Sequence, residues 1–223
     1  MTPQQAARYP IFPLPRGEGN QLENPKQGFG EFFDYMKKEI RNSILKIRDQ
    51  IPFAVRTQKD LRIKAALFTL PEFLSAKTLL LYASFRSEVA TPGIIQGSLA
   101  MGKKVLLPKV DAENSRLSLY ETESMGELSP GYMGIPEPDL PDERRAFIDD
   151  ADLAIIPGAA FDVSGNRLGY GAGCYDILLS TRRKNIPLVA LAYEEQIVDA
   201  IPAEKHDVMV DMIVTDKRVI RIP

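Results

Sequence analysis

Five short apolar segments constrain the fold of this chain more than any other feature of its sequence. They lie at residues 78–82, 104–107, 153–156, 188–192 and 212–214. Continuous apolar runs of this length are typical of strands buried on both faces, as in a parallel sheet. Segments with helical periodicity lie between several of them, at residues 91–101, 142–149 and 174–183. The alternation predicts an α/β fold, a three-layer sandwich in which helices cover both faces of a mostly parallel central sheet.

Two helices are expected before the first strand. One begins near Glu31 and ends before Pro52, and its apolar residues recur at spacings of three and four. These residues are Phe33, Met36, Ile40, Ile44 and Ile47. The second helix is predicted at residues 54–69, where Pro71 stops it.

The remaining segments complete the predicted organisation. Additional strands are expected at residues 117–120 and 219–222, and the latter should pair with the strand that ends near Thr215. Residues 1–30 hold five prolines and four glycines, a composition that disfavours helices and interior strands. We therefore expect an irregular N-terminal extension at residues 1–30, followed by a single α/β domain at residues 31–223.

Composition excludes several classes of function. The net charge of -2 gives no electrostatic reason to expect nucleic acid or an anionic membrane as a partner. One cysteine and one histidine argue against a disulfide framework and against structural zinc. No apolar run approaches the ~18 residues of a membrane span, and the N-terminus lacks the apolar core of a secretory signal. We expect a cytoplasmic protein that is a monomer or a homodimer.

A glycine-rich stretch after the strand at 153–156 is the strongest functional signal. Arg167 precedes glycines at 169, 171 and 173, and Asp176 follows where a helix can begin. Such a loop can present consecutive backbone N–H groups to phosphate oxygens. It has neither the GxxxxGK[ST] spacing of a P-loop nor the GxGxxG of a dinucleotide site, and a simple turn is the alternative. Its place beyond the carboxyl end of a strand, where open α/β sheets bind ligands, favours a nucleotide site.

The stretch also resembles a known signature. Residues 157–162 (PGAAFD) and 165–169 (GNRLG), followed by Gly171, Gly173, Tyr175 and Asp176, resemble the motif of the 5-formyltetrahydrofolate cyclo-ligase family, also called 5,10-methenyltetrahydrofolate synthetases. Other segments agree in order and spacing: Lys37 with Arg41, 82–91, 104–108, 192–196, 201–202 and 206–211. The resemblance extends from about residue 35 to residue 220, which makes it far more specific than an isolated short motif.

The resemblance implies an ATP-dependent ligase of one-carbon metabolism. In this family 5-formyltetrahydrofolate and ATP become 5,10-methenyltetrahydrofolate, ADP and phosphate, with Mg²⁺ as the metal cofactor. The formyl oxygen attacks the γ-phosphate, and N10 of the folate then displaces phosphate as the ring closes. The protein must align two ligands and neutralise phosphate charge.

The resemblance also implies site residues. The expected ATP-binding residues are Lys37, Arg41, Arg167, Leu168, Gly169, Tyr170, Gly171, Ala172, Gly173, Cys174 and Tyr175. The expected folate-binding residues are Ala83, Glu88, Tyr170, Gly171, Ala172, Gly173 and Cys174. Asp176 and Asp207 are the expected Mg²⁺ ligands, and Arg167 and Tyr175 the expected catalytic residues. Each charged residue has a structural alternative: a solvated helix face for Lys37 and Arg41, a helix cap for Asp176, a salt bridge for Asp207 and an exposed loop position for Glu88.

Two positions depart from the family pattern. Many members carry lysine at 172 and an aromatic residue at 174, where this chain has Ala172 and Cys174. Loss of the lysine removes one cation from the phosphate site, and we interpret Cys174 as a small packing residue rather than a nucleophile. Tyr120, Tyr132 and Met133 are interpreted as packing residues in preference to pocket walls. The alternative function is a catalytically impaired paralogue that binds folate or nucleotide, and a weaker one is an enzyme of this fold with another substrate.

Overall fold

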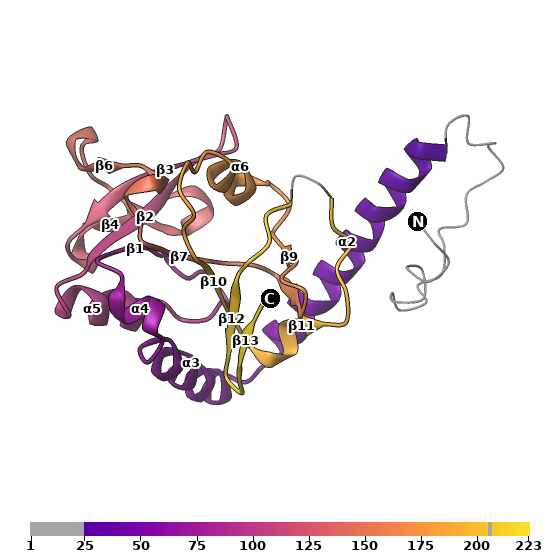
Figure 1. Cartoon of the computed structure of the whole chain (residues 1–223), viewed down its shortest axis with the longest axis horizontal. Coiled ribbons are helices and arrows are strands. Elements are labelled where there is room, and N and C mark those ends of the chain that lie inside the picture. Colours follow the sequence, from indigo (N-terminus) through magenta and orange to yellow (C-terminus); the bar gives the residue numbers. More distant parts are fainter. Residues whose placement is uncertain (1–24, 205–206) are drawn as a thin grey trace.

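A computed structural model describes residues 25–204 and 207–223. Its centre is an eight-stranded sheet in the order β13-β12-β10-β7-β1-β2-β3-β6 (Figure 1). These strands are β13 (Val219–Arg221), β12 (Met212–Thr215), β10 (Leu188–Ala192), β7 (Leu153–Ile156), β1 (Thr78–Leu80), β2 (Lys104–Asp111), β3 (Arg116–Thr122) and β6 (Arg145–Ala146). The five central strands are parallel, and β13, β3 and β6 join antiparallel at the edges. The prediction of a mostly parallel α/β sheet is confirmed.

Helices cover both faces of this sheet because its strands are apolar on both sides. Alternate strand residues divide between two cores, as the pleat of a strand requires. One core holds Leu79 and Ile155 and packs against α3 (Phe53–Leu67), α4 (Pro71–Ser75) and α5 (Pro92–Ala100). The other holds Leu80 and Ile156 and packs against α6 (Cys174–Ser180). The predicted three-layer arrangement follows from this division.

The longest helix, α2 (Pro25–Asp49), lies beside the layers rather than on a sheet face (Figure 1). Ile40 and Ile44 are buried against Ala160, Leu168 and Ile201. Ala160 and Leu168 belong to a small sheet of β8 (Ala160–Asp162), β9 (Arg167–Leu168) and β11 (Ile197–Val198). The helix is therefore fixed against the loops that follow the carboxyl ends of the central strands.

The predicted start of α2 was wrong. The helix begins at Pro25 and not near Glu31, so it includes Gly28 and Gly30. Proline is tolerated in the first turn of a helix, where its missing N–H has no intrahelical partner anyway. The rest of the predicted extension, residues 1–24, lies outside the described residues.

The predicted helix at 142–149 was also wrong. Its place is taken by β6, between the 3-10 turns η3 (Asp142–Arg144) and η4 (Ile148–Asp150). Ala146 and Arg145 pair with Leu119 and Tyr120 of β3, so edge pairing replaces helical hydrogen bonds. The predicted strand at 117–120 belongs to β3, and the one at 219–222 to β13, which pairs with β12 as expected.

A short hairpin completes the surroundings of the site. It consists of β4 (Leu128–Pro130) and β5 (Pro136–Pro138), which follow η1 (Met125–Glu127) and enclose η2 (Tyr132–Gly134). The turn η5 (Glu194–Gln196) follows β10.

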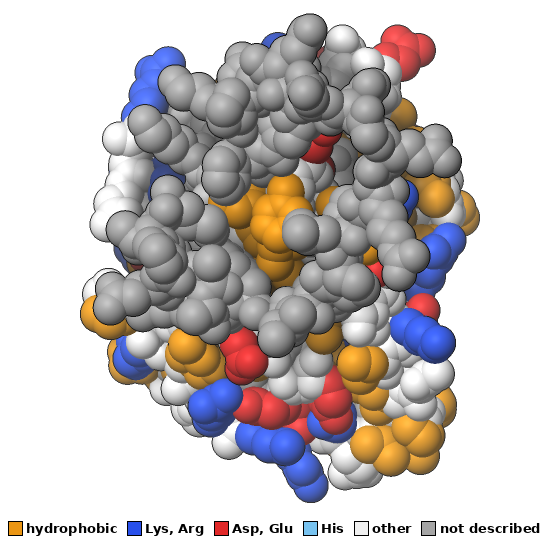
Figure 2. Space-filling view, turned by 90° about the vertical axis from the view of Figure 1, so that its right-hand side faces the viewer, with side chains coloured by type: hydrophobic (Ala, Val, Ile, Leu, Met, Phe, Trp, Pro, Cys, Tyr) orange, Lys and Arg blue, Asp and Glu red, His pale blue; other side chains and the backbone are white. Residues whose placement is uncertain are grey.

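On the face seen from the right-hand side of Figure 1, basic and acidic side chains lie near one another along the lower edge (Figure 2).

Candidate active site

A cavity of about 460 Å³ opens at the carboxyl ends of β1, β2 and β7. Its lining comes from the end of α2, the loop after β1, the strands β2 and β3, the β4–β5 hairpin, the residue that follows β7, and the glycine-rich loop with the first turn of α6. We call it the main cavity. Ala83, Glu88, Tyr170, Ala172 and Tyr175 all line it, so the structure brings predicted residues from distant segments together.

Glu88 lies on the wall formed by the loop after β1. Its carboxylate accepts a hydrogen bond from the backbone N–H of Phe85 at 2.8 Å. Burial raises the pKa of the Glu88 carboxyl, although hydrogen bonds from Tyr170 and Phe85 and the charge of Arg48 act in the opposite direction. Glu88 is therefore a shielded acceptor rather than the solvated carboxylate of the structural alternative.

Arg48 links this wall to the glycine-rich loop. Its guanidinium donates to Tyr170 Oη at 2.8 Å and to Ser87 Oγ at 3.0 Å, and only 4% of the residue is exposed. Tyr170 in turn is hydrogen-bonded to Glu88. The chain Arg48–Tyr170–Glu88 thus connects α2, the glycine-rich loop and the loop after β1. Sequence reasoning missed Arg48, although its spacing from Lys37 and Arg41 places it near the same side of the helix.

Tyr175, at the start of α6, presents a buried phenol to the main cavity. Burial raises the pKa of this phenol, and the charge of Glu88 raises it further, while the charge of Arg167 opposes the shift. The pKa of Tyr170 is likewise raised by burial. Both side chains are therefore neutral hydrogen-bond donors at physiological pH.

The glycine-rich loop requires glycine at two positions. Gly171 has φ 113° and Gly173 has φ 68°, and this left-handed region is costly for a residue with a Cβ. Gly171, Ala172 and Gly173 are exposed, whereas Arg41 lies against the loop and donates to the Gly169 carbonyl at 2.8 Å. The predicted cation Arg41 is therefore adjacent to the predicted phosphate-binding backbone.

Arg167 and Leu168 lie beneath this loop. The Arg167 guanidinium donates to Asp176 Oδ1 at 2.7 Å and to the Pro157 carbonyl at 3.2 Å, so two of its donors are used inside the protein. Among the described residues, its Nε has no hydrogen-bond partner. The side chain of Leu168 packs in the core beside Ile40. Direct contact of either side chain with phosphate stays a prediction, and Arg167 positions Asp176.

The segment that carries one predicted metal ligand contacts the other. The backbone N–H of Val208, the residue after Asp207, approaches Asp176 Oδ1 at 3.4 Å. Lys37 reaches from α2 to Asp207 Oδ2 at 2.7 Å and to Glu204 Oε2 at 2.8 Å. Burial opposes the charge of Lys37, but these hydrogen bonds outweigh it and raise the pKa of the ammonium group. Lys37 is therefore anchored at the site and is not a solvated helix residue.

Two carboxylates suit a particular kind of metal site. Within residues 25–204 and 207–223, no group of three or more histidine, cysteine, aspartate or glutamate side chains is arranged to hold a metal ion. Mg²⁺ commonly uses one or two carboxylates and completes its octahedron with water and substrate phosphates. Asp176 and Asp207 fit that requirement, whereas a permanently bound zinc would require more protein ligands.

The structure separates the three residues interpreted as packing residues. Tyr132 and Met133, on the hairpin, line the main cavity. Tyr120 is instead buried in β3, and its hydroxyl contacts Asp142 Oδ1 at 3.2 Å. The preference for packing was therefore wrong for Tyr132 and Met133, which form part of a pocket wall, and right for Tyr120.

Comparison with known proteins identifies the family. The model of the 5-formyltetrahydrofolate cyclo-ligase family matches residues 34–216. The chain belongs to this family. A cyclo-ligase of Mycolicibacterium smegmatis is 32% identical to it, with 82% of this chain and 94% of the relative covered. A mitochondrial cyclo-ligase of Arabidopsis thaliana is also 32% identical, over 83% of this chain and 76% of the relative.

A solved relative supports the same assignment. The 5,10-methenyltetrahydrofolate synthetase of Aquifex aeolicus superposes with a TM-score of 0.74 at 34% identity, covering 84% of this chain and 93% of the other. The cyclo-ligase family and the α/β fold are thus confirmed together. Among the helices of the described residues, none combines the length and the hydrophobicity that crossing a membrane requires.

The surroundings of Cys174 bear on whether its thiol is reactive. Burial raises the pKa of its thiol, which disfavours the reactive thiolate. Its Sγ lies 3.9 Å from the Ala172 carbonyl oxygen, inside the same loop. The interpretation of Cys174 as a packing residue agrees with both observations.

Proposed function

We propose that this cyclo-ligase family member converts 5-formyltetrahydrofolate and ATP into 5,10-methenyltetrahydrofolate, ADP and phosphate. The observation that supports this most is the junction between the main cavity and the glycine-rich loop. Tyr170 and Ala172 of that loop, with Tyr175 in the first turn of α6 directly after it, also line the cavity of Glu88. A ligand in the cavity and a phosphate chain on the loop would therefore meet at these residues.

The reduced folate is assigned to the main cavity. The volume of this cavity, about 460 Å³, is within the range of small-molecule sites. Glu88 accepts hydrogen bonds from the amino and ring N–H groups of the pterin, and Arg48 with Tyr170 holds that carboxylate in place. Ala83, Tyr132 and Met133 supply adjacent walls.

ATP is assigned to the loop between Arg167 and Tyr175. The exposed backbone of Gly171, Ala172 and Gly173 binds phosphate oxygens, and Arg41 adds positive charge beside it. Lys37 lies at the far end of this surface, next to Asp207. Asp176 and Asp207 would hold Mg²⁺, which neutralises phosphate charge when bound.

The reaction then requires alignment more than covalent catalysis. The formyl oxygen forms a bond to the γ-phosphorus as the bond to ADP breaks. N10 of the folate attacks the activated carbon and loses its proton, and phosphate departs with the former formyl oxygen. Tyr175 contributes a neutral phenol at the junction, whereas Arg167 acts through Asp176, which it positions.

Cellular location and assembly are part of the same proposal. We assign the protein to the cytoplasm as a monomer or homodimer.

Its relatives are named as enzymes, which disfavours the catalytically impaired paralogue. Ala172 leaves the loop with one cation fewer than many members have, and Arg41 and Lys37 are the cations that remain beside it.

The decisive assay follows formation of the methenyl product by its absorbance. Purified protein is mixed with 5-formyltetrahydrofolate, ATP and Mg²⁺, with omission of ATP and omission of Mg²⁺ as controls. We expect product only in the complete mixture. Folate binding without ATP-dependent product would contradict the proposed activity and favour the impaired paralogue.

A further inference from the structure

Two side chains hold the backbone of the loop that carries Glu88. Tyr193, which follows β10, donates its hydroxyl to Asp60 Oδ1 at 2.7 Å and, more weakly, to the Glu88 carbonyl at 3.3 Å. Asp60 belongs to α3, and the same carboxylate oxygen accepts the backbone N–H of Ala90 at 3.1 Å. The two side chains therefore form one hydrogen-bonded unit, which we call the Asp60–Tyr193 pair.

The Asp60–Tyr193 pair is shielded from water. The side chain of Tyr193 is fully buried, and both burial and the hydrogen bond to Asp60 raise the pKa of its phenol, so it remains a donor at physiological pH. Burial also raises the pKa of the Asp60 carboxyl, while hydrogen bonds from Tyr193 and Ala90 and the charge of Arg56 oppose this shift. Loss of either partner would leave a buried polar group without its hydrogen bond, so the geometry of the pair is tightly constrained.

The pair lies behind the wall of the main cavity. Glu88 lines this cavity, whereas Asp60 and Tyr193 do not. In the central sheet β10 and β1 lie on either side of β7, so the contact between Tyr193 and Glu88 spans the carboxyl ends of three neighbouring strands. The Glu88 carboxylate is bound by Phe85 and Tyr170, and the pair holds the backbone from which that carboxylate projects.

We propose that Asp60 and Tyr193 are positioning residues for folate binding, which fix the backbone of Glu88 so that its carboxylate meets the N–H groups of the pterin. This rests on the proposed function, in which Glu88 is the pterin acceptor. Hydrogen bonds weaken steeply when their distance or angle departs from the optimum. A carboxylate that accepts more than one N–H group from a rigid ring therefore requires a fixed backbone beneath it.

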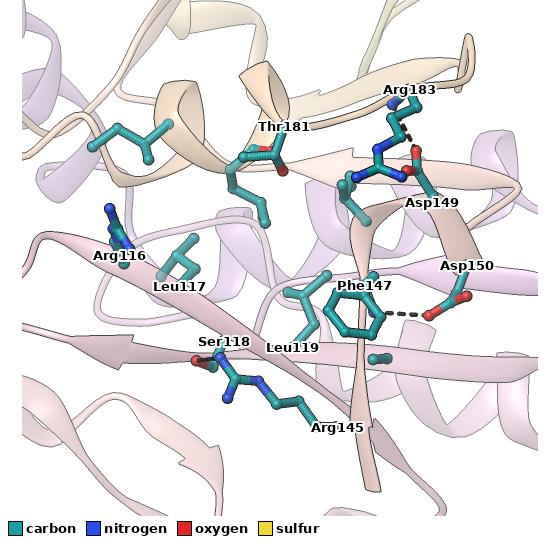
Figure 3. Close-up of a pocket in the computed structure, with 14 residues that line it drawn as sticks. Arg116, Leu117, Ser118, Leu119, Arg145, Phe147, Asp149, Asp150, Thr181 and Arg183 are labelled. Carbon is teal, nitrogen blue, oxygen red and sulfur yellow. Dashed lines mark hydrogen bonds between the residues drawn. The ribbon is translucent and has the colours of Figure 1, made fainter. Parts of the chain in front are cut away.

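The test replaces Tyr193 by phenylalanine, which removes the hydroxyl and keeps the ring. The matched control is Tyr120→Phe, because the Tyr120 hydroxyl also donates to an aspartate, Asp142, with its oxygen 3.2 Å from Oδ1. Tyr120 does not line the main cavity. Its neighbours Leu119 and Arg145 line a separate cavity of about 660 Å³ on the α6 side of the sheet (Figure 3). Both substitutions thus remove one tyrosine–aspartate hydrogen bond, but only one of them lies behind Glu88.

Steady-state kinetics give the KM for 5-formyltetrahydrofolate, the KM for ATP and kcat for each protein. Since a hydrogen bond corresponds to a factor of about five in an equilibrium constant, we expect Tyr193→Phe to raise the folate KM about fivefold. The KM for ATP and kcat should stay unchanged, and Tyr120→Phe should change none of the three. Asp60→Ala should also raise the folate KM, and Asp60→Asn, which keeps an acceptor oxygen, should raise it less. If Tyr193→Phe does not fold, the two Asp60 variants provide the same comparison.

A double-mutant cycle separates positioning from a general loss of structure. If the pair acts through Glu88, Tyr193→Phe should have no further effect on the folate KM in a Glu88→Ala background. A rise that persists in this background, an equal rise in Tyr120→Phe, or wild-type folate KM values in Tyr193→Phe and Asp60→Ala would overturn the inference while leaving the activity intact. Absence of turnover in the wild type would instead overturn the proposed function, and the inference with it.

Discussion

Replacement of Glu88 by glutamine should have opposite effects on folate affinity and on stability. The carboxylate is shielded, and burial raises its pKa above the ordinary value of 4.5. Glutamine is nearly isosteric and keeps an oxygen that can accept the Phe85 N–H, which Glu88 now binds at 2.8 Å. The substitution therefore removes the charge with little change in shape.

The loss of affinity follows from hydrogen-bond strength. A hydrogen bond to a charged acceptor is stronger than one to a neutral acceptor by about 1 kcal/mol. If two pterin N–H groups bind Glu88, the loss is about 2 kcal/mol, which corresponds to a KM for folate that is higher by about thirtyfold. The KM for ATP should change little, because Glu88 lies on the folate side of the junction.

The stability effect has the opposite sign and depends on pH. Because the pKa of Glu88 is raised in the folded state, the folded protein binds that proton more tightly than the unfolded chain. The ionised carboxylate therefore destabilises the fold at pH values above its folded pKa. Glu88→Gln should be more stable than the wild type at pH 7, and the gain should shrink as the pH falls towards 4.5.

Thermal unfolding and steady-state kinetics between pH 5 and pH 8 measure both effects, with exposed Glu113→Gln as the control. A pH-independent loss of stability would show that burial does not dominate the energetics of Glu88. An unchanged KM for folate would remove Glu88 from the pterin site.

Three further predictions concern the other parts of the site. Arg48→Met should raise the KM for folate about tenfold, because Tyr170 and Glu88 lose the hydrogen bond that holds them. The exposed control Arg62→Ala should leave this KM unchanged. Equal KM values for the two variants would show that Arg48 does not position Tyr170 and Glu88. Ala172→Lys should lower the Kd for ATP measured by calorimetry, and no change would mean that position 172 does not face phosphate. Gly173→Ala should lower the free energy of unfolding by about 1 kcal/mol, because φ at this position is 68°. Gly30→Ala should raise it by about 0.5 kcal/mol, because position 30 lies in the helix α2 and alanine is the better helix former. At neither position would the added Cβ meet another atom within 4 Å, so similar shifts in Tm for the two variants would contradict the argument from backbone conformation.

The site depends on α2 as much as on the glycine-rich loop. From this one helix, Lys37 reaches Glu204 and Asp207, Arg41 reaches Gly169, and Arg48 reaches Tyr170. Displacement of α2 would therefore disturb both proposed ligand sites at once. The apolar contacts of Ile40 and Ile44 with Ala160 and Leu168 are what hold it in place.

The sequence by itself determined the central sheet and the family. Strands buried on both faces are continuous apolar runs, so β7 and β10 could be located to the residue from composition alone. The glycines at 171 and 173 could be recognised because a positive φ favours glycine over residues with a Cβ. Both features depend on residues that are neighbours in the sequence, so they can be recognised without the tertiary structure.

Only the tertiary structure decided what depends on contacts between distant segments. Residues 142–149 form turns and an edge strand because β3 offers unpaired backbone groups, which no local propensity reports. Arg48 belongs to the site because it binds Tyr170, which lies 122 residues further along the sequence. The Arg167 guanidinium binds Asp176 inside the protein and does not lie on the surface of the loop. The cavity on the α6 side of the sheet likewise unites residues of β3, β6 and α6. Burial and pairing of this kind arise only when the chain closes on itself, and they set the charge, reach and protonation of each functional side chain.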